Sequence, residues 1–178
     1  MKRLYAFDFD GTLTTADTLL AFIRYACGTW RFIVGFLLHS PLLVLMKLKL
    51  YPNYRAKQRI FTWYFRGMEL KTFDALCRQF AERNACLIRP KAKALLERLF
   101  GEGESVCVVS ASIDNWVRPF FTNMATNSRS NFCVLGTQVE TDNNGLLTGR
   151  FLTNNCYGAE KVERLCKQYP DLTVHRND

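Results

Sequence analysis

The chain has no pair of cysteines in a C-x-x-C arrangement. Its seven cysteines are odd in number and scattered from Cys27 to Cys166, which argues against a cysteine zinc site and against a disulfide framework. We expect them to be small buried residues in a reducing compartment. Internal repeats and low-complexity segments are also absent. Because 48% of the 178 residues are hydrophobic, the chain can bury the core of one domain, or of one domain with a large insertion.

Long apolar runs are missing as well. No signal peptide is expected, because the apolar run after the basic start MKRLYAF ends at Asp8. The most apolar stretch, FIVGFLLHSPLLVLM from Phe32 to Met46, is interrupted by His39, Ser40 and Pro41. A bilayer span needs about 20 predominantly apolar residues. We therefore expect two short helices that meet near Pro41, as a buried hairpin or as a surface that rests on a membrane. The expected location is cytoplasmic, with membrane association left open.

Acidic residues are scarce in one part of the chain. Between Thr15 and Arg89 there are twelve Lys and Arg but four Asp and Glu, and the rest of the chain has twelve of each. The entire net charge of +8 therefore lies in this segment, whose pattern is helical from Ala21 to about Arg89. We predict a helical cap over residues 16–89, inserted into a core formed by residues 1–15 and 90–178. No nucleic-acid partner is expected, since no reading motif accompanies the basic residues.

Strands and helices alternate outside that segment. Strands are predicted in RLYAFDF, in ESVCVVSAS and at the start of NFCVLGTQVETDNNGLLTGRFL, which continues into a hairpin that turns at residues 143–145. Helices are predicted in RPKAKALLERLFGEG, DNWVRPFFTNMA and GAEKVERLCKQY. Apolar strands separated by helices predict an α/β fold, a Rossmann-like parallel sheet covered on both faces, with the all-helical cap inserted in it.

Two aspartates, Asp8 and Asp10, follow the first strand, and Ser110 is expected at the end of the second. Ligands of open parallel sheets bind beyond the carboxyl ends of the strands. Two close carboxylates repel each other unless a cation lies beside them, and Mg²⁺ is the natural candidate. An aspartate can also form a covalent aspartyl-phosphate, while its neighbour handles protons. The alternative is a pair of solvated aspartates that cap a loop.

Three motifs resemble those of the haloacid dehalogenase-like (HAD) superfamily. DFDGTLT, which contains Asp8 and Asp10, is similar to its first motif. VVSAS supplies the serine of the second motif, Ser110, and YGAEKVERL supplies the lysine of the third, Lys161. The motifs follow one another in the expected order and in the expected local structure.

The resemblance implies a magnesium-dependent phosphomonoester hydrolase. Asp8 would attack the phosphorus, and Asp10 would protonate the departing alkoxide and later activate water. Ser110 would hydrogen-bond a phosphoryl oxygen, helped by backbone amides that include Ala111, and Lys161 would offset the negative charge. Asp8 and Asp10 would hold the Mg²⁺ ion. Such a reaction depends mainly on positioning and on electrostatic stabilisation.

A helical cap between the first and second motifs resembles subfamily IB, the phosphoserine phosphatase type. There an acidic residue nine positions past the nucleophile serves the substrate's amino group, and here Asp17 replaces the usual glutamate. The L-x-x-F-x-R-Y-x-C pattern from Leu19 to Cys27 and the third motif are similar instead to phosphatidylglycerophosphate phosphatases. The substrate is therefore expected to be either a small soluble phosphomonoester or a lipid phosphate.

The fourth motif of the superfamily, an acidic G-D-x-x-x-D, has no counterpart in this sequence. Asp171 and Asp178 of the closing DLTVHRND stand in another context. We expect a truncated form of an active parent, with a naturally shortened and impaired product as the alternative. The second functional hypothesis is therefore a non-catalytic binding module that acts at an anionic membrane surface.

Overall fold

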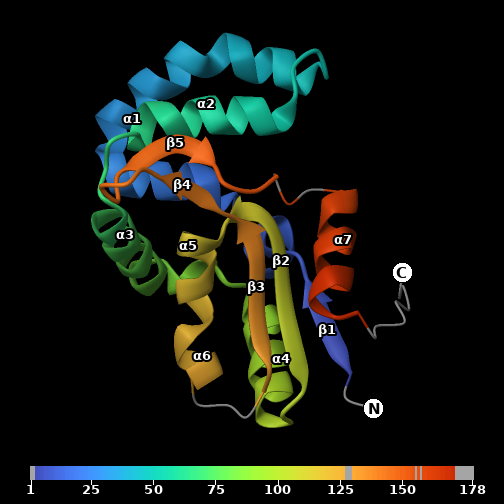
Figure 1. Ribbon diagram of the computed structural model, residues 1–178. Helices are drawn as coiled ribbons and strands as arrows, with labels where there is room; N and C mark the ends of the chain where they lie inside the picture. The colour runs from blue at the N-terminus through green and yellow to red at the C-terminus, as the bar shows by residue number, and fades with distance from the viewer. Residues whose placement is uncertain (1–2, 127–129, 155, 157, 171–178) are drawn as a thin grey trace.

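The central sheet has three parallel strands in the order β1-β2-β3 (Figure 1). The computed structural model describes residues 3–126, 130–154, 156 and 158–170. Within them, β1 is Leu4–Phe7, β2 is Ser105–Ile113 and β3 is Phe132–Thr137. Each strand is separated from the next by helices, as parallel pairing requires. The α/β fold predicted from the sequence, a parallel sheet with a helical insert, is confirmed.

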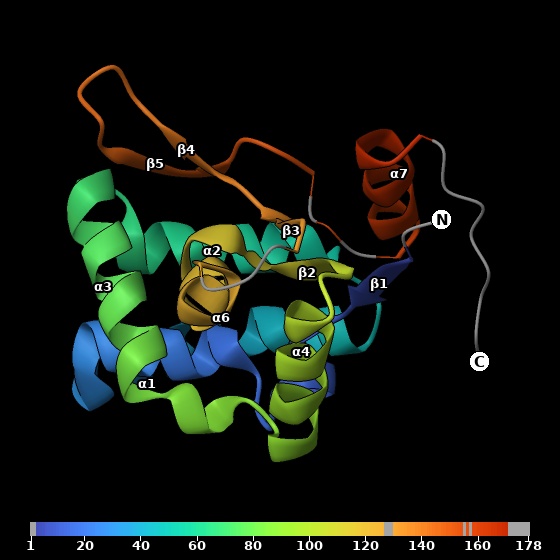
Figure 2. The same ribbon diagram turned by 90° about the horizontal axis from the view of Figure 1, so that it is seen from below.

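Helices cover both faces of the sheet (Figure 2). One face packs on α4 (Pro90–Gly101) and on the helical run α5 (Asp114–Val117), η3 (Arg118–Phe121) and α6 (Thr122–Thr126). The other face packs on α7 (Ala159–Gln168). Alternate residues of β2 serve the two faces, since Val106 and Val108 belong to the main core and Cys107 and Val109 pack with Leu165 of α7. This explains why the strand is apolar throughout.

Three helices lie between β1 and α4 in the chain: α1 (Thr18–Lys47), α2 (Asn53–Phe65) and α3 (Leu70–Arg83), followed by the short η2 (Ala85–Leu87). Their aromatic side chains continue into the core under the sheet. Phe22 of α1 stacks on Trp116 of α5 at 4.9 Å and meets Phe73 and Phe80 of α3 edge-on. The helical insert and the sheet therefore share one apolar core. The cap boundaries at residues 16 and 89 stay a prediction.

A β-hairpin that follows β3 packs against helix α2 of the insert. The strands β4 (Val139–Thr141) and β5 (Leu147–Phe151) pair in antiparallel fashion around the turn expected at residues 143–145. The hydroxyl of Thr62 in α2 donates to the carbonyl of Gly149 at 2.7 Å. Gly149 has a φ of +85°, and a Cβ there would lie 2.8 Å from a Thr62 methyl group. Only glycine fits this close contact.

The prediction of two short helices that meet near Pro41 is wrong. Helix α1 continues through Pro41, and its break lies at Gly28, whose φ of 77° and ψ of 161° are open to glycine but not to other residues. Proline removes the amide hydrogen that would bond to the carbonyl of Leu37. The hydroxyl of Ser40 donates to that carbonyl instead, at 2.8 Å, which lets the helix continue.

Helix α1 is the one helix of the described chain that is long and apolar enough to cross a bilayer. Its most apolar 18-residue window has a mean hydropathy of 1.5, yet 6% of that window is buried. The stretch is therefore not the buried hairpin that the sequence left open.

Candidate functional site

The loop after β1 carries Asp8 and Asp10 to the carboxyl edge of the sheet. Its tight turn, η1 (Phe9–Leu13), begins with the carboxylate of Asp8, which accepts the amide hydrogen of Phe9 at 2.8 Å. Gly11 completes the turn with a φ of 76°. Arg89 donates its Nε–H to the carbonyl of Thr14 at 3.0 Å, and this contact ties the start of the insert to its end.

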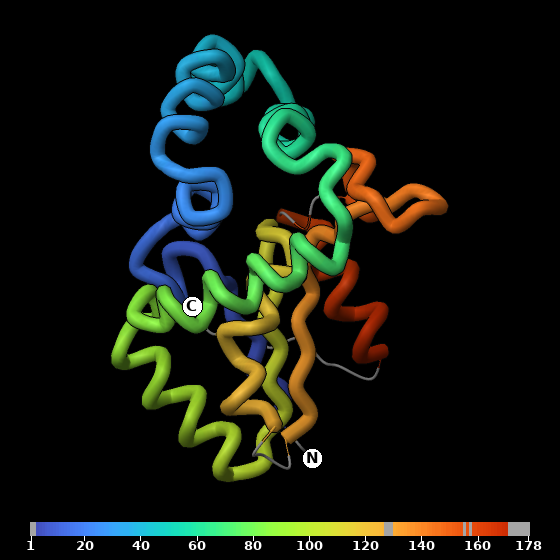
Figure 3. Tube along the Cα trace, turned by 90° about the vertical axis from the view of Figure 1, so that its left-hand side faces the viewer, coloured from blue at the N-terminus to red at the C-terminus, as the bar shows by residue number. Residues whose placement is uncertain are grey.

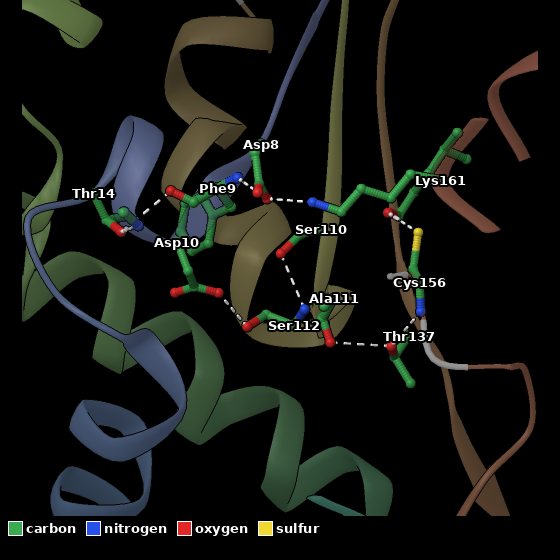
Figure 4. A network of polar contacts seen from close by, with 12 residues as sticks. Asp8, Phe9, Asp10, Thr14, Ser110, Ala111, Ser112, Thr137, Cys156 and Lys161 are labelled. Carbon is green, nitrogen blue, oxygen red and sulfur yellow. Dashed lines mark hydrogen bonds and ion pairs between the residues drawn. The ribbon is translucent and has the colours of Figure 1, made fainter. Parts of the chain in front are cut away.

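Lys161 meets Asp8 at this edge. The first turn of α7 places the Lys161 Nζ 2.8 Å from the Asp8 Oδ1, as expected for a lysine that offsets the charge of the first aspartate. Figure 4 shows the side chains of Asp8 and Lys161 pointing toward each other, with Ser110 nearby. Because 45% of the Asp8 side chain is exposed, the ion pair contributes little to folding, and its geometry is of interest for chemistry.

Asp10 is held by hydrogen bonds to both carboxylate oxygens. Its Oδ1 accepts from the backbone amide of Thr18 at 2.8 Å and from the Thr18 hydroxyl at 2.6 Å. Its Oδ2 accepts from the hydroxyl of Ser112 at 2.5 Å (Figure 4). The indole of Trp116 in turn donates to the Thr18 hydroxyl at 3.3 Å. These contacts lock the orientation of the carboxylate at the junction of the sheet and the insert.

Ser110 does not end its strand, contrary to expectation. β2 continues to Ile113, but its pairing with β1 stops at Val108 and its register against β3 shifts between Val109 and Ile113. Ser110 thus lies beyond the paired end of β1. It is fully buried, and its Oγ accepts the amide hydrogen of Ser112 at 3.0 Å.

The other two residues predicted to bind substrate lie at the edges of this network. The carbonyl of Ala111 accepts from the Thr137 hydroxyl at 3.2 Å. The carboxylate of Asp17 accepts the amide hydrogen of Leu19 at 2.9 Å and so forms the N-cap of α1. The predicted roles of both residues in substrate binding stay predictions.

Lys57 of α2 is a site residue that the sequence did not reveal. It lines a small pocket together with Ala111, Ser112 and Trp116. Burial lowers the pKa of Lys57, while Asp17, Asp10 and Asp8 counteract this effect by attraction. A basic residue on a helix is usually exposed to solvent, but Lys57 is half-buried and lies among carboxylates. Its position therefore suggests a role in the site. No local pattern marked it, because its position depends on how α2 lies over the sheet.

Ser112 and Thr18 were also missed. Ser112 stands two residues after Ser110 in the quoted VVSAS, and such neighbours project from the same side of a strand, which could have signalled it. Thr18 had no signal beyond its place after Asp17, since its contact with Asp10 is a tertiary one.

A larger cavity lies beside the network. It has a volume of about 620 Å³ and is lined from α2 by Asn53, Tyr54 and Gln58, from the end of β5 by Phe151, and from α7 by Glu160, the neighbour of Lys161. Phe151 also lines the pocket of Lys57, so the two spaces adjoin. The cavity is large enough for the organic part of a small ligand.

The described residues contain no group of three or more His, Cys, Asp or Glu side chains placed to hold a metal ion. Two oxygen donors, Asp8 and Asp10, are nevertheless present, and Mg²⁺ is usually bound by one or two carboxylates together with substrate phosphate and water. Among the described residues, no hydrogen-bond donor contacts the Asp8 Oδ2. This donor set fits Mg²⁺ through Asp8. Asp171 and Asp178 lie outside the described residues.

Comparisons with known proteins agree with these motifs. A family model described as haloacid dehalogenase-like hydrolase matches residues 5–174. Protein CicA of Caulobacter vibrioides is 32% identical over 176 residues, which cover 96% of this chain and 75% of that protein.

Solved structures share the fold at lower identity. A protein of unknown function from Bordetella pertussis Tohama I has a TM-score of 0.77 at 16% identity, with 98% of this chain and 77% of that chain covered. A phosphoserine phosphohydrolase-like protein from Francisella tularensis has a TM-score of 0.62 at 14% identity, with 94% and 73% covered. A phospho-aspartyl intermediate analogue of phosphoserine phosphatase has a TM-score of 0.55 at 18% identity, with 95% and 73% covered.

Proposed function

The chain belongs to the haloacid dehalogenase-like hydrolases, and we propose that it is a magnesium-dependent phosphomonoester hydrolase that acts through an aspartyl-phosphate on Asp8. The observation that carries this proposal is the 2.8 Å contact between the Lys161 Nζ and the Asp8 Oδ1. These residues are far apart in the sequence, and because Asp8 is 45% exposed, the ion pair between them contributes little to stability. A lysine beside an exposed aspartate at the carboxyl edge of a parallel sheet suits a nucleophile that approaches an anionic phosphoryl group.

The reaction has two steps. An oxygen of Asp8 bonds to the phosphorus while the bond from phosphorus to the ester oxygen breaks, and the departing oxygen takes a proton from Asp10. A water molecule then gives a proton to Asp10 and attacks the phosphorus, which breaks the bond to Asp8 and releases inorganic phosphate. Asp10 thus acts first as an acid and then as a base.

The contacts of Asp10 support this role. Thr18 and Ser112 together engage both carboxylate oxygens and fix the direction in which the group points. The Oδ1 already accepts two hydrogen bonds, whereas the Oδ2 accepts one and can accept a second, so a proton can still be exchanged there with the leaving group or with water. Thr18 and Ser112 act in this scheme as positioning residues.

Several groups would stabilise the phosphoryl oxygens. Lys161 supplies a positive charge, and Ser110 and the amide of Ala111 lie at the same edge as hydrogen-bond donors. Hydrolases of this family are typically magnesium-dependent. When Mg²⁺ is bound, through Asp8 and with Asp10 as the second candidate ligand, it neutralises charge on the phosphoryl oxygens.

The cavity of about 620 Å³ would receive the organic part of the ester. Its lining is mixed, with the aromatic Tyr54 and Phe151 beside the polar Asn53 and Gln58. Lys57 in the adjoining pocket adds a positive charge on the cap side of the phosphoryl position. The substrate class that we propose is therefore a phosphomonoester, either a small soluble one or one carried by a lipid.

The test is hydrolysis of p-nitrophenyl phosphate with Mg²⁺, combined with trapping of covalent phosphate. We expect turnover in the unaltered chain and a loss of about a thousandfold or more in Asp8→Asn, because the nucleophile is removed. Beryllium fluoride with Mg²⁺ should raise the Tm of the unaltered chain and leave that of Asp8→Asn unchanged.

Asp142→Asn is the matched control, since Asp142 lies in the hairpin turn and its replacement keeps the turn's hydrogen-bond acceptor. It should hydrolyse the ester at the normal rate. A chain that neither hydrolyses esters nor binds beryllium fluoride would contradict the proposal and would favour the non-catalytic binding module.

A further inference from the structure

The part of α1 beyond Gly28 has apolar side chains on two opposite faces. One face packs on α2. There Gly35 allows the ring of Tyr64 to approach so closely that a Cβ would clash with it, and the Tyr64 hydroxyl donates to the carbonyl of Phe32 at 2.9 Å. His39 meets Trp63 edge-on at 6.0 Å. Packing on α2 therefore explains the apolar residues on this face of α1, but not those on the opposite face.

The opposite face is exposed. Six large apolar residues, at positions that fall on one side of an α-helix, lie along it and form what we call the apolar stripe. Their exposed fractions run from 53% to 80%. The stripe consists of Trp30, Val34, Leu37, Leu38, Val44 and Leu48.

Such a stripe is unusual on a water-facing helix, which normally carries charged and polar residues on its outer face. Between Phe32 and Met46 the sequence has no charged residue at all. Contiguous exposed apolar surface of this kind marks an interaction site. Figures 1 and 3 place this part of α1 at the outer end of the molecule, above α2 and away from the sheet.

Positive charge lies at one end of the stripe. From Thr18 to Met68 the chain has eight basic residues and no acidic one. Four of the basic residues are exposed near the turn that joins α1 to α2, at the Leu48 end of the stripe, and none of them forms an ion pair within the described residues. They are Lys47, Lys49, Arg55 and Arg59.

We propose that the apolar stripe and these four basic residues dock on the anionic surface of a lipid bilayer. The stripe would lie in the interface between head groups and acyl chains, and the basic residues would meet the head groups. A second copy of the chain fits this surface less well, because it would bring two sets of the same positive charges together. The proposal stands on the surface alone and is independent of the hydrolase activity.

The opposite face of α1 explains why docking is peripheral. A single bilayer span would have to separate α1 from α2 and expose Trp63 and Tyr64, whose packing on α1 is part of the fold. An interfacial position keeps that packing and buries the exposed stripe only.

The test is co-sedimentation of the full chain with vesicles of phosphatidylcholine alone and of phosphatidylcholine mixed with phosphatidylglycerol. Binding is expected to the mixed vesicles, weaker at high salt and weak on the neutral ones. Leu37→Glu combined with Val44→Glu should lower the partition coefficient at least about tenfold, because two apolar side chains lose their burial. Both residues are exposed, and circular dichroism should show unchanged folding.

Two matched controls test whether the location of the changed residues matters, and not only the kind of change. Leu152→Glu with Val162→Glu changes two exposed apolar residues, 66% and 55% exposed, outside the stripe and should bind normally. Lys47→Gln with Lys49→Gln should lower binding about thirtyfold, since each basic residue near an anionic surface contributes. Lys91→Gln with Lys167→Gln removes the same charge elsewhere and should have a far smaller effect.

Three outcomes would overturn the proposal. The first is binding that is equal on neutral and mixed vesicles or unchanged by the stripe variants. The second is a monomer–dimer equilibrium that the stripe variants abolish in the absence of any vesicle binding, which would make the surface an interface between copies. The third is bound protein that resists extraction by alkaline carbonate, which would indicate a bilayer span.

Discussion

The core and the helical cap use their charges differently. All six ion pairs of the described residues join side chains outside residues 16–89, for example Arg164 with Glu160 and Lys161 with Asp8. Within residues 16–89, the basic side chains outnumber the acidic ones twelve to four, and the described part forms no ion pair. Charged side chains of the cap that support the fold, such as Arg89 and Asp17, bond to backbone groups, and the positive charge of the cap is not neutralised by ion pairs. It remains free to meet anions from outside, at the substrate pocket and on the outer surface.

The first way to test this comparison is to remove the charge of Lys161, the core lysine that we place at the phosphoryl group. Lys161→Met should lower kcat about a hundredfold, because one stabilising donor of the transition state is lost. The Tm should hardly change, since Asp8 is 45% exposed and the ion pair is largely screened. Steady-state kinetics and thermal unfolding measure the two quantities.

Lys167→Met, an exposed change on the same helix, is the control and should affect neither quantity. Lys161→Arg should restore part of the rate. If Lys161→Met lowered the Tm by several degrees with normal turnover, the ion pair would be structural and the comparison would fail.

The second test concerns Lys57, the one cap lysine that faces the core site. Lys57→Met should lower kcat/KM about tenfold, the effect of losing one contact to a charged group. The same change should stabilise the fold at neutral pH, because burial opposes the charged form of Lys57. Activity and stability should therefore move in opposite directions.

The effect of Lys57 on stability should depend on pH. Since the pKa of Lys57 is lowered on folding, the unfolded chain binds the proton more tightly, and stability rises with pH between the folded and unfolded pKa values. The Tm of the unaltered chain should approach that of Lys57→Met as the pH is raised toward 10.5, the ordinary lysine value. Arg59→Met, on the exposed side of α2, should show neither effect.

Topology alone placed Asp8 at the carboxyl edge of the sheet, because it follows a strand. Lys161 was found only through the resemblance of YGAEKVERL to the third motif, and the structure places its Nζ 2.8 Å from the Asp8 Oδ1. The supports of Asp10 could not be read in this way. Thr18 and Ser112 lie 8 and 102 residues from it, and their hydrogen bonds exist only when the insert has folded against β2.

The helices of the cap were predicted less well from the sequence. Proline and glycine indicate where a helix can break, but neighbouring residues decide whether it does. Pro41 predicted a break that Ser40 compensates for with one hydroxyl. No break was predicted at Gly28, although the backbone there adopts a conformation that needs glycine. Lys57 was hidden for a related reason, since a basic residue on a helix is usually solvated and only the packing of α2 over the sheet shows that this one is half-buried.

The prediction with the smallest expected effect concerns the Ser40 hydroxyl, which lets α1 continue through Pro41. Ser40→Ala should lower the free energy of unfolding by about 0.5 kcal/mol, because the Leu37 carbonyl loses its donor but can still bond to water. In a Pro41→Ala background the residue at 41 regains its amide hydrogen, so the same change should cost nothing. A double-mutant cycle in urea measures this coupling, and equal costs in both backgrounds would show that the Ser40 hydroxyl does not replace the missing donor.

The same pair of variants then sharpens the contrast between core and cap. Leu37 belongs to the apolar stripe, and a carbonyl without a donor becomes more costly when the surface around it is shielded from water. Ser40→Ala should therefore weaken binding to anionic vesicles more in the Pro41 background than in the Pro41→Ala background. The hydroxyl that lets α1 pass through a proline in solution would thus matter most where that part of the helix meets lipid.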